Sequence, residues 1–445
     1  MNKFPRLGAK QTLAVGFVVI ILTGALLLML PISNKSGEFL PFLDALFTST
    51  SATCVTGLVV YDTWSQFTIF GQVVILLLIQ IGGLGFMTIA ILFSMVLRKR
   101  IGLRERSFAM EAVSSLQISG VIRLVRHILI GTLIFELIGA AILATRFYSV
   151  FGDSRAIWFG IFHSVSAFCN AGFDLMGSLG QYSSLTGFSS DLAVNITVMV
   201  LIVTGGIGFV IWEDLFINRF KFSKYNLHTK IVLVSTLAMI LISTMLFLVI
   251  EKDATLSGME TGERILAAFF HSVTPRTAGF NTTDTAALSE AGSMLTMILM
   301  FIGASPGSTA GGIKITTFVV IVLSVVTYFR KSEDVNIFNR RLDAKIVKRA
   351  YFSVTYYTLL VLAGCFIIVA NQGIPIKEAL FETLSAIGTV GLSLGVTRDL
   401  STLSKIVVVS LMYIGRLGSL TVFMAVTEKR NYRKVRNPME KIIIG

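Results

Sequence analysis

Four short polar stretches, each with a glycine near its end, interrupt the long apolar segments of this chain, and they constrain its fold more than any other feature. They are FTSTSATCVTGL (47–58), FHSVSAFCNAGF (162–173), FHSVTPRTAGF (270–280) and FETLSAIGTVGL (381–392). Each begins with Phe and ends in Gly followed by Leu or Phe, and the four glycines are 107–115 residues apart. Self-similarity at a nearly constant interval indicates one structural unit used four times. We interpret this unit as helix, re-entrant loop, helix.

Composition places these units in a membrane. Of the 445 residues, 54% are hydrophobic and 14% are charged, against about 25% charged in soluble domains. Apolar segments long enough to cross a bilayer fall at 11–31, 70–97, 123–147, 191–217, 229–250, 292–329, 350–370 and 402–426. We therefore predict an all-α polytopic membrane protein with eight transmembrane spans and four re-entrant pore loops around a central ion pore. The predicted repeats are 1–106, 107–222, 223–340 with an intramembrane loop at 303–314, and 341–445 with the C-terminal tail.

The net charge of +13 is explained by orientation in the membrane better than by nucleic-acid binding. The N-terminus, the links after each repeat and the C-terminal tail hold 27 Lys and Arg and 9 acids, whereas the connections on the other side, which flank the loops, hold 8 basic residues and 15 acids. Basic residues accumulate on the cytoplasmic side of membrane proteins. We predict a multi-pass protein of the bacterial plasma membrane with both termini cytoplasmic, so the four loops enter from outside.

The loops have the properties of an ion filter. The first half of each forms a short helix whose negative dipole end favours a cation, and the second half runs extended to the glycine. Backbone carbonyl groups at membrane depth are tolerated where they line a cavity or bind ions. The predicted ion-binding residues share a position at or just before the glycine: Val55, Thr56, Gly57, Asn170, Ala171, Gly172, Thr277, Ala278, Gly279, Thr389, Val390 and Gly391.

No Asp or Glu lies among these filter residues, which favours backbone coordination of a large monovalent cation over a divalent one. The simpler alternative is four ordinary glycine turns. Four acids follow the glycines, namely Asp62, Asp174, Asp284 and Asp399. They either concentrate cations at an outer mouth or are solvated loop residues, and the sequence leaves both open.

The sixth apolar segment contains GASPGSTAGGIK (303–314), which is too rich in Gly, Ser and Pro to continue a helix. A kinked helix with close glycine packing is the alternative. Arg416 is a charge inside an otherwise apolar span, and such charges are usually functional. The predicted gate residues lie in the segment and the last span: Gly303, Ala304, Ser305, Pro306, Gly307, Ser308, Thr309, Ala310, Gly311, Gly312 and Arg416.

Two basic residues and two glycine runs complete the prediction. We expect Arg276 to brace the third loop from behind, with Glu382 as its partner, and Lys314 to have a structural role. The runs at 82–85 (GGLG) and 205–208 (GGIG) are typical of close helix packing.

Essentially the whole chain resembles the Trk/Ktr/HKT family of potassium transporters, in particular its bacterial KtrB-type membrane subunits. The resemblance rests on the four repeats, one glycine per loop and the Gly/Ser insert in the sixth span. It implies that residues 303–314 obstruct the ion path beneath the filter. It also implies a homodimer, with one pore per subunit, on a cytoplasmic ring of nucleotide-binding (ATP/ADP) regulatory subunits of the KtrA type.

The predicted function is therefore potassium uptake, with K⁺ as the transported ion, Na⁺ as an activator and no covalent cofactor or resident metal. Gly57 favours potassium, because serine at this position accompanies sodium transport in the plant relatives. The first alternative is a sodium-selective or sodium-coupled transporter on the same scaffold. The second is a membrane enzyme, which the scattered histidines, His127, His163, His228 and His271, do not support.

Overall fold

The computed structural model describes residues 9–85, 120–219 and 221–418, together with the isolated positions 88, 89, 91, 92, 102, 110, 438 and 440. The predicted basic segments 98–106 and 429–441 therefore lie largely outside the described residues. Within the described ranges the chain is helical, apart from loops and one small hairpin of β1 (Asn336–Ile337) and β2 (Arg340–Arg341).

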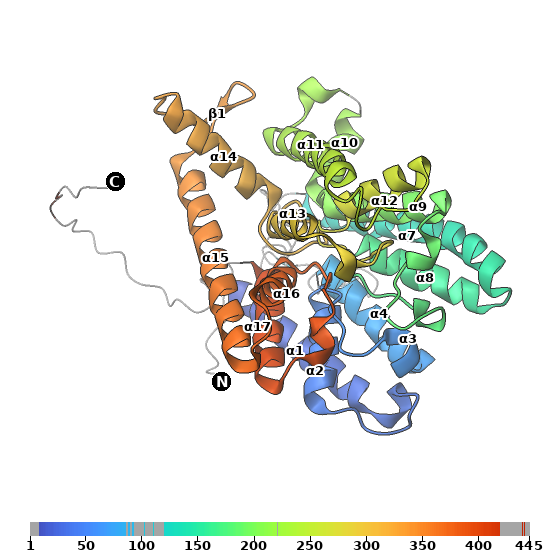
Figure 1. The fold of residues 1–445 in the computed structure, drawn as a ribbon. Coiled ribbons are helices and arrows are strands. Elements are labelled where there is room, and N and C mark those ends of the chain that lie inside the picture. The colour runs from blue at the N-terminus through green and yellow to red at the C-terminus, as the bar shows by residue number, and fades with distance from the viewer. Residues whose placement is uncertain are drawn as a thin grey trace.

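The helices form four successive units with the same order: a long helix, a short helix, a loop and a second helix. Unit 1 contains α1 (Ala9–Met29), α2 (Phe42–Thr53), the single turn α3 (Thr63–Gln66) and α4 (Ile69–Leu84), and unit 2 contains α7 (Val121–Phe151), α8 (Arg155–Phe168), α9 (Leu192–Gly206) and α10 (Phe209–Asn218). Unit 3 contains α11 (Leu227–Ile250), α12 (Thr261–Val273), α13 (Glu290–Phe301) and α14 (Ile315–Phe329). Unit 4 contains α15 (Ala344–Gln372), α16 (Ile376–Gly388) and α17 (Thr402–Leu417). Figure 1 shows the units around a common centre in chain order, from blue through green and yellow to red.

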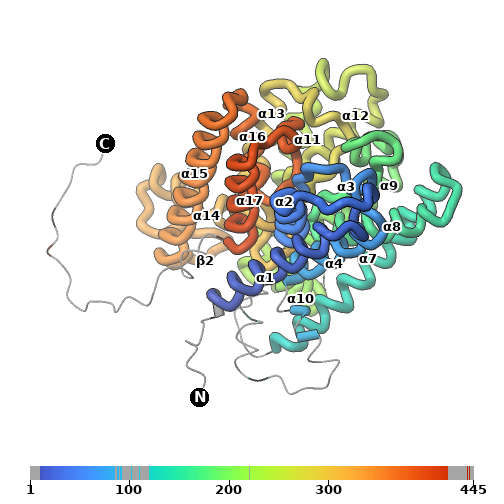
Figure 2. The backbone as a smooth tube through the Cα atoms, turned by 90° about the horizontal axis from the view of Figure 1, so that it is seen from below, coloured from blue at the N-terminus to red at the C-terminus, as the bar shows by residue number. Residues whose placement is uncertain are grey.

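The long helix of every unit is apolar and long enough to cross a membrane. These are α1 from Gln11 onward, α7, α11 and α15, and their exposed faces carry large hydrophobic residues such as Leu137 and Leu246. An exposed apolar surface of this extent suits a hydrocarbon solvent rather than water. The chain is thus a multi-pass membrane protein, as its composition predicts. In Figure 2, α10 and β2 lie toward the lower end of the molecule, where α1 begins, and α12 and α13 toward the opposite end.

The second helices differ from the prediction, because the chain does not break only in the sixth span. The predicted span 191–217 is divided into α9 and α10, which meet at an angle of 95°. Helices α4 and α17 end at Leu84 and Leu417, in each case before a glycine of positive φ. Gly85, Gly208 and Gly418 have φ of +81°, +100° and +83°, a conformation that glycine adopts at little cost and that ends a helix.

The short helices pack at the centre of the molecule. The Phe that opens each stretch is fully or almost fully buried: Phe47, Phe162, Phe270 and Phe381. Close glycine packing holds α2, α8 and α16 against the second helices, because a Cβ on Gly82, Gly205 or Gly415 would collide with the carbonyl oxygen of Thr53, Phe168 or Ile387. The packing interpretation of residues 82–85 and 205–208 is therefore confirmed, and the same glycine runs also terminate the helices.

Candidate functional site

The four predicted loops share one backbone conformation. Two residues before each glycine the chain enters the left-handed region, with φ of +57° at Val55, +58° at Asn170, +69° at Thr277 and +51° at Thr389. The glycines also have positive φ, between +71° and +91°. Non-glycine residues rarely adopt this region, so its use at the same position of all four loops indicates a shared structural requirement rather than four unrelated turns.

The four glycines meet in a closed ring. A Cβ added to Gly57 would lie within 3.0 Å of the carbonyl oxygen of Ala171, and one on Gly172 within 3.0 Å of that of Ala278. The series continues from Gly279 to Val390 and returns from Gly391 to Thr56. Each loop thus places the carbonyl group that precedes its glycine against the glycine of the neighbouring loop. The absence of a side chain is what permits this approach.

Hydroxyl groups of the short helices brace the loops. The backbone N–H groups of Gly57 and Gly391 donate to the Oγ atoms of Ser51 and Ser385, both at 3.1 Å. In units 2 and 3 the hydroxyls instead donate to the residue after the glycine, Ser166 to the Phe173 carbonyl at 2.7 Å and Thr274 to the Phe280 carbonyl. Sequence reasoning missed these four residues, although each is the fifth of its stretch and is Ser or Thr in every repeat.

Other hydroxyls in the loops lack a protein partner. The Oγ1 atoms of Thr56, Thr277 and Thr389 are buried and accept or donate no hydrogen bond among the described residues. An unpaired buried hydroxyl costs free energy. These oxygen atoms would be suitable ligands for a dehydrated cation in the ring. The predicted filter residues therefore present neutral oxygen atoms, from backbone carbonyl groups and from threonine and asparagine side chains.

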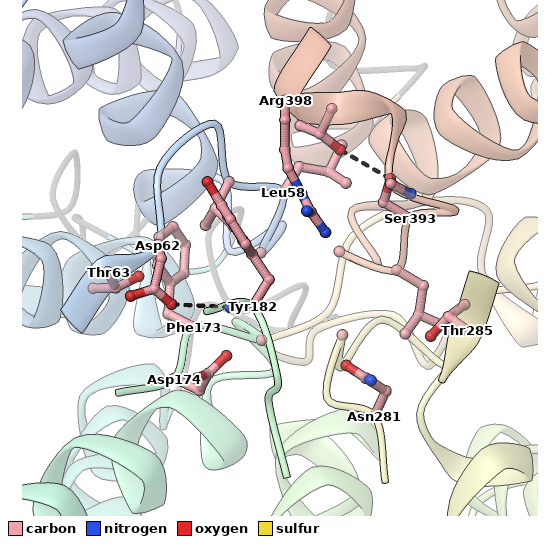
Figure 3. A pocket seen from close by; sticks show the side chains of 18 of the residues that line it. Leu58, Asp62, Thr63, Phe173, Asp174, Tyr182, Asn281, Thr285, Ser393 and Arg398 are labelled. Carbon is pink, nitrogen blue, oxygen red and sulfur yellow. Dashed lines mark hydrogen bonds between the residues drawn. The ribbon is translucent and has the colours of Figure 1, made fainter. Parts of the chain in front are cut away.

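A cavity of about 140 Å³ lies next to the ring, with the four glycines in its lining. Asp62, Asp174 and Asp284 line it as well, whereas Asp399 does not. Figure 3 shows Asp62 and Asp174 on one side of this cavity and Asn281 and Thr285 on another. The predicted acids are thus brought together around the ring, with the exception of Asp399.

The carboxylates at this mouth also have structural roles. Asp62 accepts from the Ser65 N–H at 2.7 Å and Asp284 from the Ala286 N–H at 2.9 Å, which caps the turns that follow. Asp174 accepts from the Met176 N–H at 2.9 Å. Burial raises the pKa of Asp174 to about 7, and the neighbouring Asp62 carboxylate adds to that rise while the Met176 hydrogen bond opposes it. Asp62 and Asp174 are therefore ordered parts of the mouth, whereas Asp284 caps its turn from an exposed position.

Below the ring, the segment between α13 and α14 is a non-helical loop, as predicted from its glycines. Its backbone pairs with unit 2, through Ser305 N–H to Gly206 at 3.1 Å and Phe209 N–H to Gly307 at 2.9 Å, and with unit 4, through Gly312 N–H to Gly415 at 3.2 Å.

The loop also touches the filter. A Cβ on Gly311 would collide with the side chain of Thr389, and one on Gly312 would lie 3.0 Å from the Gly388 carbonyl oxygen. The loop thus lies directly against the inner side of the fourth filter segment. Continuation as a kinked helix, the alternative, is excluded by the interruption between Phe301 and Ile315.

Arg416 connects this loop to two units. One guanidinium nitrogen donates to the Thr309 carbonyl, and the other donates to the carbonyls of Gly82 and Gly83, the latter at 3.0 Å. The planar fork of arginine suits several acceptors at once. The contact with the loop was predicted, whereas the contact with unit 1 was not, because nothing in the sequence brings residues 82 and 416 together.

Lys314 reinforces the loop from its own end. The Nζ atom donates to the carbonyls of Ala310 at 2.8 Å and Gly311 at 2.9 Å. A second cavity, of about 190 Å³, lies beside these groups and is lined by Gly83, Ser308, Lys314 and Arg416. Two basic side chains therefore border the space next to the loop.

The partner expected for Arg276 was wrong. Arg276 is buried and donates to the Thr236 hydroxyl at 3.1 Å. Glu382 instead accepts from Ser393 at 2.8 Å and Thr397 at 2.6 Å, both within its own unit. Ser393 and Thr397 are only 11 and 15 residues from Glu382 in the sequence. These nearby hydroxyl groups satisfy the carboxylate, so Glu382 needs no partner from unit 3. Arg276 does lie behind its loop, so only the identity of its partner changes.

Comparison with known proteins decides the family. The family model described as TrkH, cation transport protein, matches residues 8–434. The chain belongs to the TrkH family. The chain is 43% identical to the "Ktr system potassium uptake protein B" of Bacillus subtilis, over 97% of this chain and 96% of that protein. It is 40% identical to the "Potassium/sodium uptake protein NtpJ" of Enterococcus hirae, over 99% and 98% of the two chains.

The fold of this TrkH family member agrees with a solved structure. The potassium transporter TrkH from Vibrio parahaemolyticus superimposes with a TM-score of 0.74 at 19% identity, over 96% of this chain and 86% of that chain. At this identity the likeness concerns the fold alone. The resemblance inferred from the four loops is thereby confirmed, as is the helical membrane fold.

Proposed function

We propose that this chain is a potassium uptake protein in which K⁺ passes through the ring of Gly57, Gly172, Gly279 and Gly391. The observation that carries the proposal is the closed ring itself. Each glycine faces the carbonyl group of the residue that precedes the glycine of the neighbouring loop. Carbonyl oxygens around an axis replace the hydration shell of a cation. The chain that forms this ring belongs to a family of cation transport proteins. Relatives that match nearly the whole chain are named for potassium uptake.

Neutral oxygen ligands support potassium over a divalent ion. The filter segments carry no carboxylate, and the carboxylates of the mouth lie outside the ring. A divalent cation is held best by several carboxylate or other charged oxygen ligands. Carbonyl and threonine oxygens therefore suit a monovalent ion that sheds its water readily. The ion path carries no covalent cofactor in this proposal, and Na⁺ acts as an activator.

The loop 303–314 is the gate in this proposal. Its backbone lies against Thr389 and Gly388 of the filter, and Arg416 and Lys314 add positive charge on its side of the ring. The loop obstructs the path, and the charges raise the barrier for a cation. Opening requires displacement of a glycine-rich segment held by a few hydrogen bonds, which is a small motion for a binding partner to drive.

The partner we propose is a cytoplasmic ring of nucleotide-binding subunits of the KtrA type, with the chain itself as a homodimer. Support comes from the name of the Bacillus subtilis relative, which belongs to a Ktr system. The docking surface we propose comprises residues 219–230, residues 330–349 and the C-terminal tail, which lies outside the described residues. The segment 330–349 includes the exposed residues Arg340 and Arg341 of the hairpin, so acidic or polar faces of a partner suit it. Both termini are cytoplasmic in this orientation.

A sodium-selective or sodium-coupled transporter is the second candidate, favoured by the "potassium/sodium" name of the relative from Enterococcus hirae. Gly57 separates the two. A serine at this position adds a side chain to the ring, and we expect Gly57→Ser to lower the preference for K⁺ over Na⁺ in uptake measurements.

Expression in a bacterium that lacks its own potassium uptake systems tests the proposal. We expect the chain, together with a KtrA-type subunit, to restore growth at low external K⁺ and to drive K⁺ uptake. Cells that contain both proteins, with this chain in their membrane, and still fail to grow at low external K⁺ would contradict potassium uptake.

A further inference from the structure

Among the described residues, one positively charged side chain lines the cavity outside the filter. The lining contains three carboxylates, Asp62, Asp174 and Asp284, and one cationic side chain, Arg398 of unit 4. Figure 3 shows Arg398 extending into this cavity beside Tyr182, above the loops that carry the ring. A fixed positive charge at the entrance of a cation path repels the transported ion. Such a charge therefore needs a role, and discrimination among cations is one.

The position of Arg398 is determined by contacts and not by chance exposure. Its guanidinium lies 3.9 Å from the ring centroid of Tyr182, a cation–π contact. The preceding residue, Thr397, is buried and donates to Glu382 at 2.6 Å. None of the salt bridges found between described residues involves Arg398, so its charge is not neutralised by a direct carboxylate partner.

Tyr182 is itself fixed to another unit. Its hydroxyl donates to the Val60 carbonyl at 3.0 Å, and its N–H donates to Asp62 at 3.3 Å. Its backbone has φ of +60°, which is an uncommon conformation for a tyrosine. Tyr182 of unit 2 is thus anchored on unit 1 and supports an arginine from unit 4. The pair bridges the outer mouth across three of the four units.

We propose that Arg398, held over the mouth by Tyr182, determines specificity by repelling divalent cations from the filter. The proposal rests on the proposed cation uptake through the ring. Ordered carboxylates at a narrow mouth attract Mg²⁺ and Ca²⁺ more strongly than K⁺, because electrostatic energy scales with ionic charge. A fixed positive charge opposes that bias. It lowers the local concentration of a monovalent ion by one Boltzmann factor and that of a divalent ion by the square of the factor.

This square relation gives a sharp test. As a general scale, removal of a unit charge about 7 Å from an ion in water changes monovalent occupancy roughly threefold and divalent occupancy about sevenfold. We expect Arg398→Gln to lower the external K⁺ concentration for half-maximal uptake roughly threefold. At external K⁺ well below half-saturation, the Ba²⁺ concentration that halves uptake is expected to fall about sevenfold. Uptake of K⁺ is measured in cells that express the full chain with its regulatory subunit, at increasing external Ba²⁺.

Matched variants distinguish charge from structure. Arg155→Gln removes the same charge at an exposed site paired with Asp153, outside the lining of the cavity, and should leave both values unchanged. Arg398→Lys keeps the charge and should retain rejection of Ba²⁺, whereas Tyr182→Leu should weaken it even if Arg398→Gln does not reach the membrane.

Two results would overturn the proposal. One is an equal change in the K⁺ and Ba²⁺ values of Arg398→Gln, and the other is a loss of rejection in Arg398→Lys equal to that in Arg398→Gln. Failure of the underlying function has a different signature, because the unaltered chain would then take up no K⁺. If the unaltered chain takes up Na⁺ instead, the same ratio is measured with that ion.

Discussion

Replacing Gly172 with alanine places a side chain inside the ring, and the structure gives the consequence in some detail. Gly172 has φ of +71°, and an added Cβ would lie 2.8 Å from the Ala278 carbonyl oxygen and 2.9 Å from the Cα of Gly279. Both atoms are backbone, so the clash is relieved only by movement of the third loop. Gly152, at the end of α7, is a matched control because its φ is +67° and no atom lies within 4 Å of the added Cβ.

The two variants share one cost and differ in another. An alanine in the left-handed conformation costs about 1–2 kcal/mol at either position. Only Gly172→Ala adds overpacking, at about 1–3 kcal/mol. If the ion-occupied ring bears that added cost, the half-saturating K⁺ concentration rises roughly 5- to 150-fold, since 1.4 kcal/mol corresponds to a factor of ten.

The assay is initial K⁺ uptake as a function of external K⁺, with the thermal unfolding of both purified variants as the measure of stability. We expect Gly152→Ala to lose stability without a change in half-saturation, and Gly172→Ala to change both. Equal half-saturation in the two variants, at comparable amounts in the membrane, would refute the assignment of Gly172 to the ion path.

Four further outcomes are expected. Arg416→Ala, or deletion of residues 303–314, should raise maximal K⁺ flux several-fold and reduce its dependence on the regulatory subunit, whereas unchanged or lower flux in a folded variant leaves the loop without a gating role. Ser385→Ala removes the acceptor for the Gly391 N–H and should destabilise the purified protein by about 1–3 kcal/mol, with Ser410→Ala on the exposed face of α17 as control. Because the pKa of Asp174 is raised to about 7, the half-saturating K⁺ concentration should rise as external pH falls through 7 and the carboxylate becomes neutral, and Asp174→Asn should abolish this dependence. The same raised pKa means that the destabilising contribution of Asp174 grows as pH rises from about 4 to 7, so thermal unfolding of Asp174→Asn should lack that pH dependence.

Much of the fold follows from short-range signals in the sequence. The opening Phe residues and the closing glycines of the four stretches predict buried short helices and loops, and the structure places them so. The break in unit 3 was predicted because Gly, Ser and Pro are dense there. The breaks after Leu84, Gly206 and Leu417 were missed, although the pattern G-x-x-G at 82–85, 205–208 and 415–418 marks each of them.

The rest depends on packing between units. The contact of Arg416 with Gly83 joins residues 333 positions apart, and no local pattern encodes it. The expected pairing of Arg276 with Glu382 failed because hydroxyl groups nearer to Glu382 satisfy its carboxylate. Tyr182 and Arg398 attract no attention in the sequence, since neither lies in a motif, and only the anchoring of Tyr182 on unit 1 reveals their relation.

The central claim is that one K⁺-selective path runs through the ring of four glycines, and the flux of K⁺ and Na⁺ through the purified chain in proteoliposomes tests it most directly. We predict that K⁺ flux exceeds Na⁺ flux for the unaltered chain. Each of Gly57→Ser, Gly172→Ser, Gly279→Ser and Gly391→Ser should reduce that preference, because every loop contributes to the same ring. Selectivity and flux that stay unchanged in all four variants would contradict the account.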